Sequence, residues 1–192
     1  MHWAIPFDRQ RHEALQGVSR RRSLELLLTG RVYPEEQMLE LMERKNHYYE
    51  ELLKQGAPQD LLPGVRHLLE AVRAADCKIA LGSASQNARE AVQWLHLASS
   101  LDAMADGDSV VRPRPAPDLF VSAAGLLRVC VHACILFEDV AAGVEAAQVA
   151  RMYAVGLGPV ARVGQANLGL PALSHVTLPD ILHRLLPAHS RG

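Results

Sequence analysis

The stretch ACILFEDVAAGVEAAQVA, residues 133–150, decides the fold class. Its first five residues are apolar without alternation, which predicts a strand that is buried on both faces. Two acids follow, and the alanine-rich residues 141–150 predict a helix. A buried strand that leads directly into a helix is the repeating unit of a parallel sheet covered by helices. This stretch therefore predicts an α/β fold.

The same alternation extends outward from this stretch, from residue 61 to the C-terminal region. Strands are expected at 78–82, 133–137, 153–156 and 175–178, and helices at 64–75, 87–97, 117–127, 141–150 and 179–186. This order predicts a doubly wound parallel sheet over residues 61–192. Residues 1–60 show helical spacing alone, with one helix expected over 19–29 and another from Pro34 to just before Gly56, and they predict a separate helical module.

Composition excludes several classes of protein. The 192 residues carry a net charge of −1, so the basic excess that a sequence-independent nucleic-acid binder needs is missing. The most apolar stretch, 126–137, is interrupted by Arg128 and His132 and is far shorter than the ~20 residues of a membrane-spanning helix. The N-terminus has no secretory signal pattern, and the three cysteines lie mostly in apolar runs. A cytoplasmic protein is expected.

Small polar residues follow the strand expected at 78–82. In the run GSASQN, residues 82–87, Ser83 can donate a hydrogen bond to a phosphate oxygen, and backbone N–H groups at the next helix start favour an anion. Ser85 or Asn87 can cap that helix. Helix capping alone is the alternative interpretation of this loop.

Charged residues follow the strand at 133–137 and precede the helix at 117–127. Glu138 and Asp139 are adjacent acids after a buried strand, and their oxygens suit Mg²⁺ together with a substrate phosphate. An N-cap role for Asp139 is the alternative. Arg114 lies in a loop stiffened by prolines and would place a fixed positive charge beside the acids. A surface arginine is the alternative there.

These motifs, in this order, resemble those of the haloacid dehalogenase superfamily, and within it the β-phosphoglucomutases. The resemblance is carried in the core by the loop of Ser83, by Arg114 before PAPD (115–118), and by EDVAAG (138–143). In the helical part it is carried by LQGVSR (15–20) and RKN (44–46). It implies a HAD-like α/β core over residues 61–192 with a partial helical cap over residues 1–60.

The resemblance also implies a role for each matching residue. Ser83 and Arg114 would be the catalytic residues that hold the transferring phosphoryl group, and Glu138 and Asp139 would bind Mg²⁺. The implied substrate-binding residues are Gly17, Val18, Arg20, Ser23, Lys45, Ser85, Gln86 and Asn87. The implied reaction interconverts β-D-glucose 1-phosphate and glucose 6-phosphate through a bisphosphate. A small phosphorylated sugar is the expected partner, and the protein is expected to be a monomer.

Three departures from the family pattern affect this expectation. Arg114 and Gln86 stand where the family usually has lysines, which changes the hydrogen-bond donors. The motif Asp-x-Asp-Gly, whose aspartates serve the family as nucleophile and general acid/base, does not occur before the cap. The family's strand that carries it is central, so its absence predicts a gap between neighbouring strands. The hypotheses are a mutase whose recorded sequence begins too late, a non-catalytic sugar-phosphate-binding remnant, and a phosphatase of another small ester.

Overall fold

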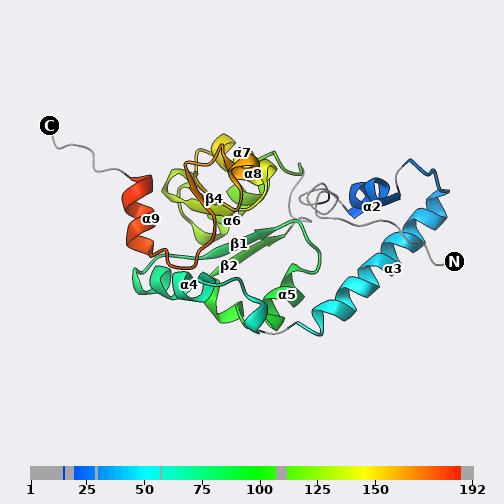
Figure 1. The fold of residues 1–192 in the computed structure, drawn as a ribbon, viewed down its shortest axis with the longest axis horizontal. Coiled ribbons are helices and arrows are strands. Elements are labelled where there is room, and N and C mark those ends of the chain that lie inside the picture. Colours follow the sequence, from blue (N-terminus) through cyan, green and yellow to red (C-terminus); the bar gives the residue numbers. More distant parts are fainter. Residues whose placement is uncertain (1–14, 16–19, 29, 57, 107–111, 187–192) are drawn as a thin grey trace. The chain divides into compact units, whose positions relative to one another are not determined.

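The computed structural model describes residue 15 and residues 20–28, 30–56, 58–106 and 112–186. The chain divides into two compact units, residues 1–55 and residues 56–192, and each is considered by itself (Figure 1). None of the helices in the described ranges is long and apolar enough to cross a membrane.

The described residues of the first unit include the helices α2 (Arg20–Leu28) and α3 (Glu35–Leu53). Leu24 and Leu28 of α2 are buried against Met38 of α3, as the helical spacing of their apolar residues predicts. Arg21 of α2 donates a hydrogen bond of 2.8 Å to Glu35, the first residue of α3. Both helices therefore lie where the sequence predicts them, and apolar packing joins them.

The second unit alternates helices with short parallel strands. Its main elements are α4 (Val65–Ala74), β1 (Ala80–Ser83), α5 (Ala88–Trp94), β2 (Ala103–Asp106), α6 (Asp118–Leu127), β3 (Ile135–Glu138), α7 (Ala141–Val149), β4 (Tyr153–Leu157), α8 (Val160–Val163), β5 (Leu168–Leu170) and α9 (Leu178–Leu185). Short 3₁₀ turns cover Pro58–Asp60, Ala98–Ser100 and Val131–Ala133. The prediction of an α/β fold with parallel strands is confirmed.

The strands form two separate parallel sheets, β1–β2 and β3–β4–β5. Ser83 at the end of β1 is paired in register with Asp106, and Glu138 at the end of β3 is paired with Gly156. Within the described ranges, β1 and β3 each have one strand partner only. Every residue of β1 is partly exposed, whereas Ala154 and Val155 of the doubly paired β4 are completely buried. The edges of β1 and β3 that lack a strand partner in the described ranges are therefore less protected from solvent than β4.

Helices cover the strands on two sides. One apolar cluster joins α6 and α7 to β2 and β4, and it includes Phe120, Val144 and Ala154. A second cluster joins α4 and α9 to the opposite face of β4, where Val155 and Ile181 are both completely buried. Figure 1 shows β1 and β2 between α4 on one side and α6 on the other. Loops with polar residues follow the carboxyl ends of β1 and β3.

The structure corrects one expected strand and adds two that the sequence did not predict. The strand expected at 175–178 is wrong, because His175 has a left-handed φ of 70° and Thr177 begins α9 with a capping box to Asp180. The apolar alternation there comes from a turn and a helix start. Strands β2 and β5 were not expected, because they are only four and three residues long and their pairing with β1 and β4 defines them.

The carboxylate of Asp102 connects the residue before β1 to α4 through hydrogen bonds, and these bonds allow a prediction about stability. It accepts the N–H of Ile79 at 2.7 Å and a guanidinium N–H of Arg73 at 2.9 Å. The Ile79 N–H is the largest cause that holds the pKa of Asp102 below its ordinary value of 3.8, with Arg73 contributing further. A carboxyl with a lowered folded-state pKa stabilises the fold above its ordinary pKa, and this contribution is lost as the pH falls through the folded-state value.

We therefore expect Asp102→Asn to lower the melting temperature at neutral pH and to lose this effect as the pH falls below 3.8. Thermal unfolding followed by circular dichroism across this range measures the difference. Glu145→Gln, which changes an exposed carboxylate on α7, serves as the control and should shift the melting temperature little at any pH. A pH-independent difference for Asp102→Asn would contradict the assignment.

Candidate phosphate-binding site

The loop after β1 is organised by serine hydroxyl groups. Oγ of Ser83 accepts the N–H of Ser85 at 3.2 Å, and Oγ of Ser85 accepts the N–H of Asn87 at 3.3 Å. Both hydroxyl oxygens act as acceptors here, and each O–H bond can still donate to an anion. Asn87 occupies the N-cap position of α5 and is buried, but its side chain makes no capping hydrogen bond. Ser85 and Gln86 are exposed at the loop surface.

Arg114 and Glu138 form an ion pair near the carboxyl end of β3. A guanidinium N–H of Arg114 donates to Oε1 of Glu138, and the two side chains are only 15% and 9% exposed. Oε2 of Glu138 accepts the N–H groups of Asp139 at 2.9 Å and Val140 at 3.1 Å. Arg114 is therefore not a surface arginine, and its charge is fixed by a buried carboxylate.

The environment of Glu138 affects its titration. Burial is the largest influence and raises the pKa of this carboxyl above its ordinary value, while Arg114 and the N–H of Val140 oppose the rise. Asp139 is exposed beside it. Asp139 is not the N-cap of α7, because Val140 occupies that position. The backbone N–H groups that precede α7 are instead satisfied by Glu138.

The residues at this edge fit a magnesium ion only in part. Mg²⁺ commonly uses one or two carboxylates, several waters and a substrate phosphate. Asp139 presents an exposed carboxylate that suits this role. Both oxygens of Glu138 already accept hydrogen bonds, so Glu138 serves first as the partner of Arg114. No group of three or more acidic, histidine or cysteine ligands occurs among the residues that the structure describes.

The first unit brings two of the predicted substrate-binding residues close enough to interact. Partial burial of the ammonium group and, secondly, the positive charge of Arg20 lower the pKa of Lys45. An anion placed near both cations would relieve their repulsion. Ser23 is buried in α2, so its hydroxyl belongs to the interior of this unit. Gly17 and Val18 lie outside the described residues.

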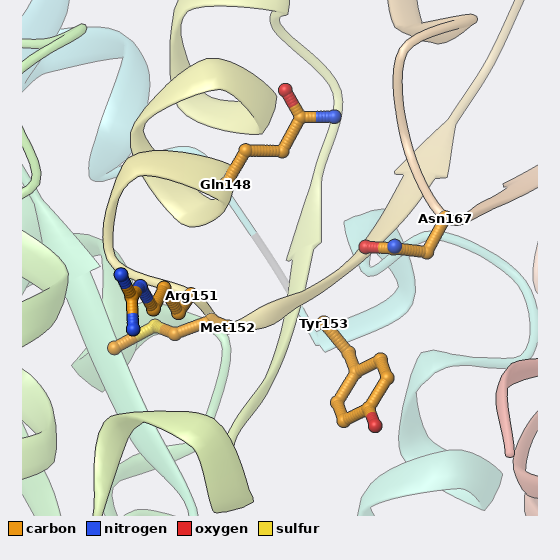
Figure 2. Close-up of a pocket in the computed structure, with 5 residues that line it drawn as sticks. All are labelled: Gln148, Arg151, Met152, Tyr153 and Asn167. Carbon is orange, nitrogen blue, oxygen red and sulfur yellow. The ribbon is translucent and has the colours of Figure 1, made fainter.

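A pocket of about 280 Å³ lies away from the predicted site. It is lined by Gln148, Arg151, Met152, Tyr153 and Asn167. Figure 2 shows Arg151 and Met152 where α7 gives way to β4, and Asn167 on the segment before β5. Tyr153 begins β4, so this pocket lies at the amino end of the strand, whereas Glu138 lies at the carboxyl end of β3. The predicted site residues are not part of it.

Sequence reasoning assigned no role to two groups at this edge. Asp106, which ends β2 opposite Ser83, accepts a hydrogen bond of 3.3 Å from Arg89 of α5. Gly143 is buried in the first turn of α7 next to the side chain of Glu138. A strand of four residues gives too weak a pattern to reveal the first. The motif EDVAAG contained the second, but a glycine in a motif does not show by itself what it contacts.

This parallel α/β unit, with its serine loop, its buried arginine and its two acids, agrees with the resemblance that the sequence motifs indicate. The family model of the haloacid dehalogenase-like hydrolases matches residues 4–151, and the chain belongs to this family.

Two sequence relatives and one solved structure are similar to most of this chain. The chain is 38% identical over 183 residues to the β-phosphoglucomutase of Bacillus subtilis, with 93% of this chain and 80% of that protein covered. It is 30% identical over 188 residues to the phosphorylated carbohydrates phosphatase of Thermotoga maritima, with 94% and 83% covered. The crystal structure of a β-phosphoglucomutase from Clostridium difficile matches with a TM-score of 0.87 at 32% identity, covering 95% of this chain and 83% of that one.

Proposed function

We propose that the chain acts on a phosphorylated sugar as a β-phosphoglucomutase, which interconverts β-D-glucose 1-phosphate and glucose 6-phosphate through a bisphosphate. The observation that carries this proposal is the buried Arg114–Glu138 pair beside the carboxyl end of β3. A guanidinium held in this way is a preorganised site for a phosphoryl group. The similarity to the Bacillus subtilis enzyme over nearly the whole chain supports this substrate class.

Each unit, considered by itself, has residues that suit a sugar phosphate. In the α/β unit, Arg114 and the Ser83 hydroxyl would hold the transferring phosphoryl group, with Ser85, Gln86 and Asn87 around it. In the first unit, Arg20 and Lys45 would bind the sugar or its phosphate, with Gly17, Val18 and Ser23 supporting. Burial and, secondly, the charge of Arg20 lower the pKa of Lys45, and an anion beside both cations would relieve their repulsion.

Magnesium fits this proposal through Asp139. Bound Mg²⁺ supplies neutralisation of the charge on the phosphoryl oxygens. The chain's own residues bind and orient the phosphate, and Glu138 holds Arg114. No attacking carboxylate is assigned among the residues that the structure describes.

The proposal is tested by measuring three properties of the purified 192-residue chain with β-D-glucose 1-phosphate and Mg²⁺. Calorimetry measures binding, a coupled assay measures glucose 6-phosphate, and a colorimetric assay measures released phosphate. Isomerisation supports the mutase. Phosphate release favours a phosphatase, the second candidate, which the similarity to the Thermotoga maritima enzyme supports. Binding without turnover indicates a sugar-phosphate-binding remnant, and absence of binding overturns all three.

We expect Asp139→Asn to weaken Mg²⁺ binding in the presence of inorganic phosphate by about tenfold or more, because loss of even an indirect partner of a metal has an effect of this size. Titration calorimetry measures the affinity. Asp76→Asn, which removes an exposed carboxylate on the turn after α4, is the control and should leave the affinity unchanged. Equal affinities for wild type and Asp139→Asn would remove Asp139 from the metal site.

A further inference from the structure

Gly143 occupies a place where a side chain would collide with Glu138. A Cβ atom built on Gly143 would lie 2.2 Å from Cδ, 2.3 Å from Oε1 and 2.4 Å from Cγ of Glu138. Each of these distances is well inside the van der Waals contact of two heavy atoms. The backbone of Gly143 lies in the first turn of a right-handed helix, where any residue is allowed. Glycine is therefore required at this position because there is no room for a side chain, and not because of the backbone conformation.

The Glu138 carboxylate is also constrained from its other sides. Its Oε2 accepts two backbone N–H groups, from Asp139 and Val140, and its Oε1 accepts from Arg114. A methyl group at position 143 would meet Oε1 itself and push away the oxygen that contacts Arg114. The carboxylate could not move away without losing at least one of these hydrogen bonds.

The orientation of Arg114 depends strongly on this contact. Nε of Arg114 is buried and has no hydrogen-bond partner in the part of the chain that the structure describes. The ion pair with Glu138 is thus the contact that orients the guanidinium. If Glu138 were displaced, Arg114 would keep its charge but its guanidinium would change orientation. Two parallel hydrogen bonds from a guanidinium to a phosphate depend on that orientation.

We propose that Gly143 is a positioning residue for phosphate binding. Because Gly143 has no side chain, it leaves room for the Glu138 carboxylate, and Glu138 in turn orients Arg114 toward the anion. Gly143 itself touches no substrate. This inference rests on the proposed function, in which Arg114 holds the phosphoryl group.

A double-mutant cycle in thermal unfolding tests the contact between residues 143 and 138 without any ligand. Gly143→Ala is expected to lower the melting temperature in the wild-type background. In the Glu138→Ala background it should cause a much smaller loss, because the three nearest atoms that the new methyl meets all belong to Glu138. The control is Gly125→Ala on α6, where a Cβ would meet nothing within 4 Å. Equal losses in the two backgrounds would overturn the contact.

Binding of inorganic phosphate, measured by calorimetry, separates positioning from mere stability. We expect Gly143→Ala to weaken phosphate binding by about tenfold or more in the wild-type background and to have no further effect in the Arg114→Ala background. Gly125→Ala should bind phosphate as the wild type does. A folded Gly143→Ala variant with wild-type phosphate affinity would overturn the inference. If the wild type binds no phosphate, the proposed function fails. The double-mutant cycle in thermal unfolding then decides by itself whether Gly143 determines the position of Glu138.

Discussion

Replacing Arg114 with alanine is expected to destabilise the second unit by about 3–5 kcal/mol, because it leaves Glu138 buried without its cationic partner. The side chain of Glu138 is only 9% exposed, so the guanidinium and not water is its main polar partner on that side. The raised pKa of Glu138 limits the loss, since the carboxyl can take up a proton when its partner is removed. Urea unfolding at neutral pH measures the change, and phosphate binding should be weaker in the same variant.

A second arginine in the same loop provides a matched control. Arg112 pairs with Asp118 through hydrogen bonds of 3.1 Å and 2.8 Å, but its side chain is 69% exposed. Exposed ion pairs contribute little, so Arg112→Ala should unfold at nearly the wild-type urea concentration. Arg114→Lys keeps the charge and should recover part of the stability. Similar losses for Arg112→Ala and Arg114→Ala would show that burial of the pair is not the cause.

Hydrogen exchange is expected to separate the strands of the second unit by large factors. Strand β4 pairs on both sides, and Ala154 and Val155 are completely buried, so its amides should exchange only through global unfolding. Amides on the edges of β1 and β3 that have no strand partner among the described residues should exchange through local opening. We expect them to exchange roughly a hundredfold faster than those of β4.

Exchange followed by NMR at neutral pH measures these rates residue by residue. The amides of β1 that face β2 serve as an internal control, because they are hydrogen-bonded within the same short strand. They should be slower than those on its open edge. Uniform protection across β1, β3 and β4 would contradict the prediction and would show that another segment covers the open edges.

The sequence was sufficient to predict the strand–helix units because continuous apolar runs such as 133–137 leave few alternatives to a buried strand. It did not reveal β2 or β5, whose short segments become strands through pairing with distant partners. The strand predicted at 175–178 is a turn followed by a capping box. The prediction was wrong because alternation of apolar and polar residues over only four positions is a weak signal for a strand. Local patterns therefore predicted the long elements, and tertiary pairing decided the short ones.

The candidate site was predictable in its location but not in its internal pairing. Ser83, Arg114 and Glu138 were expected near the carboxyl ends of strands, and each lies at or beside one. Glu138 as a metal ligand stays a prediction, and the sequence did not predict that its oxygens also accept hydrogen bonds from Arg114 and the backbone. Spacing along the chain does not show that residues 24 positions apart will form a buried pair.

The cationic pair of the helical unit is sensitive to alkaline conditions. Partial burial and, secondly, the charge of Arg20 lower the pKa of Lys45, so this lysine loses its charge at a lower pH than an ordinary lysine. Rising alkalinity would therefore weaken anion binding by the helical unit, because the neutral amine no longer attracts an anion.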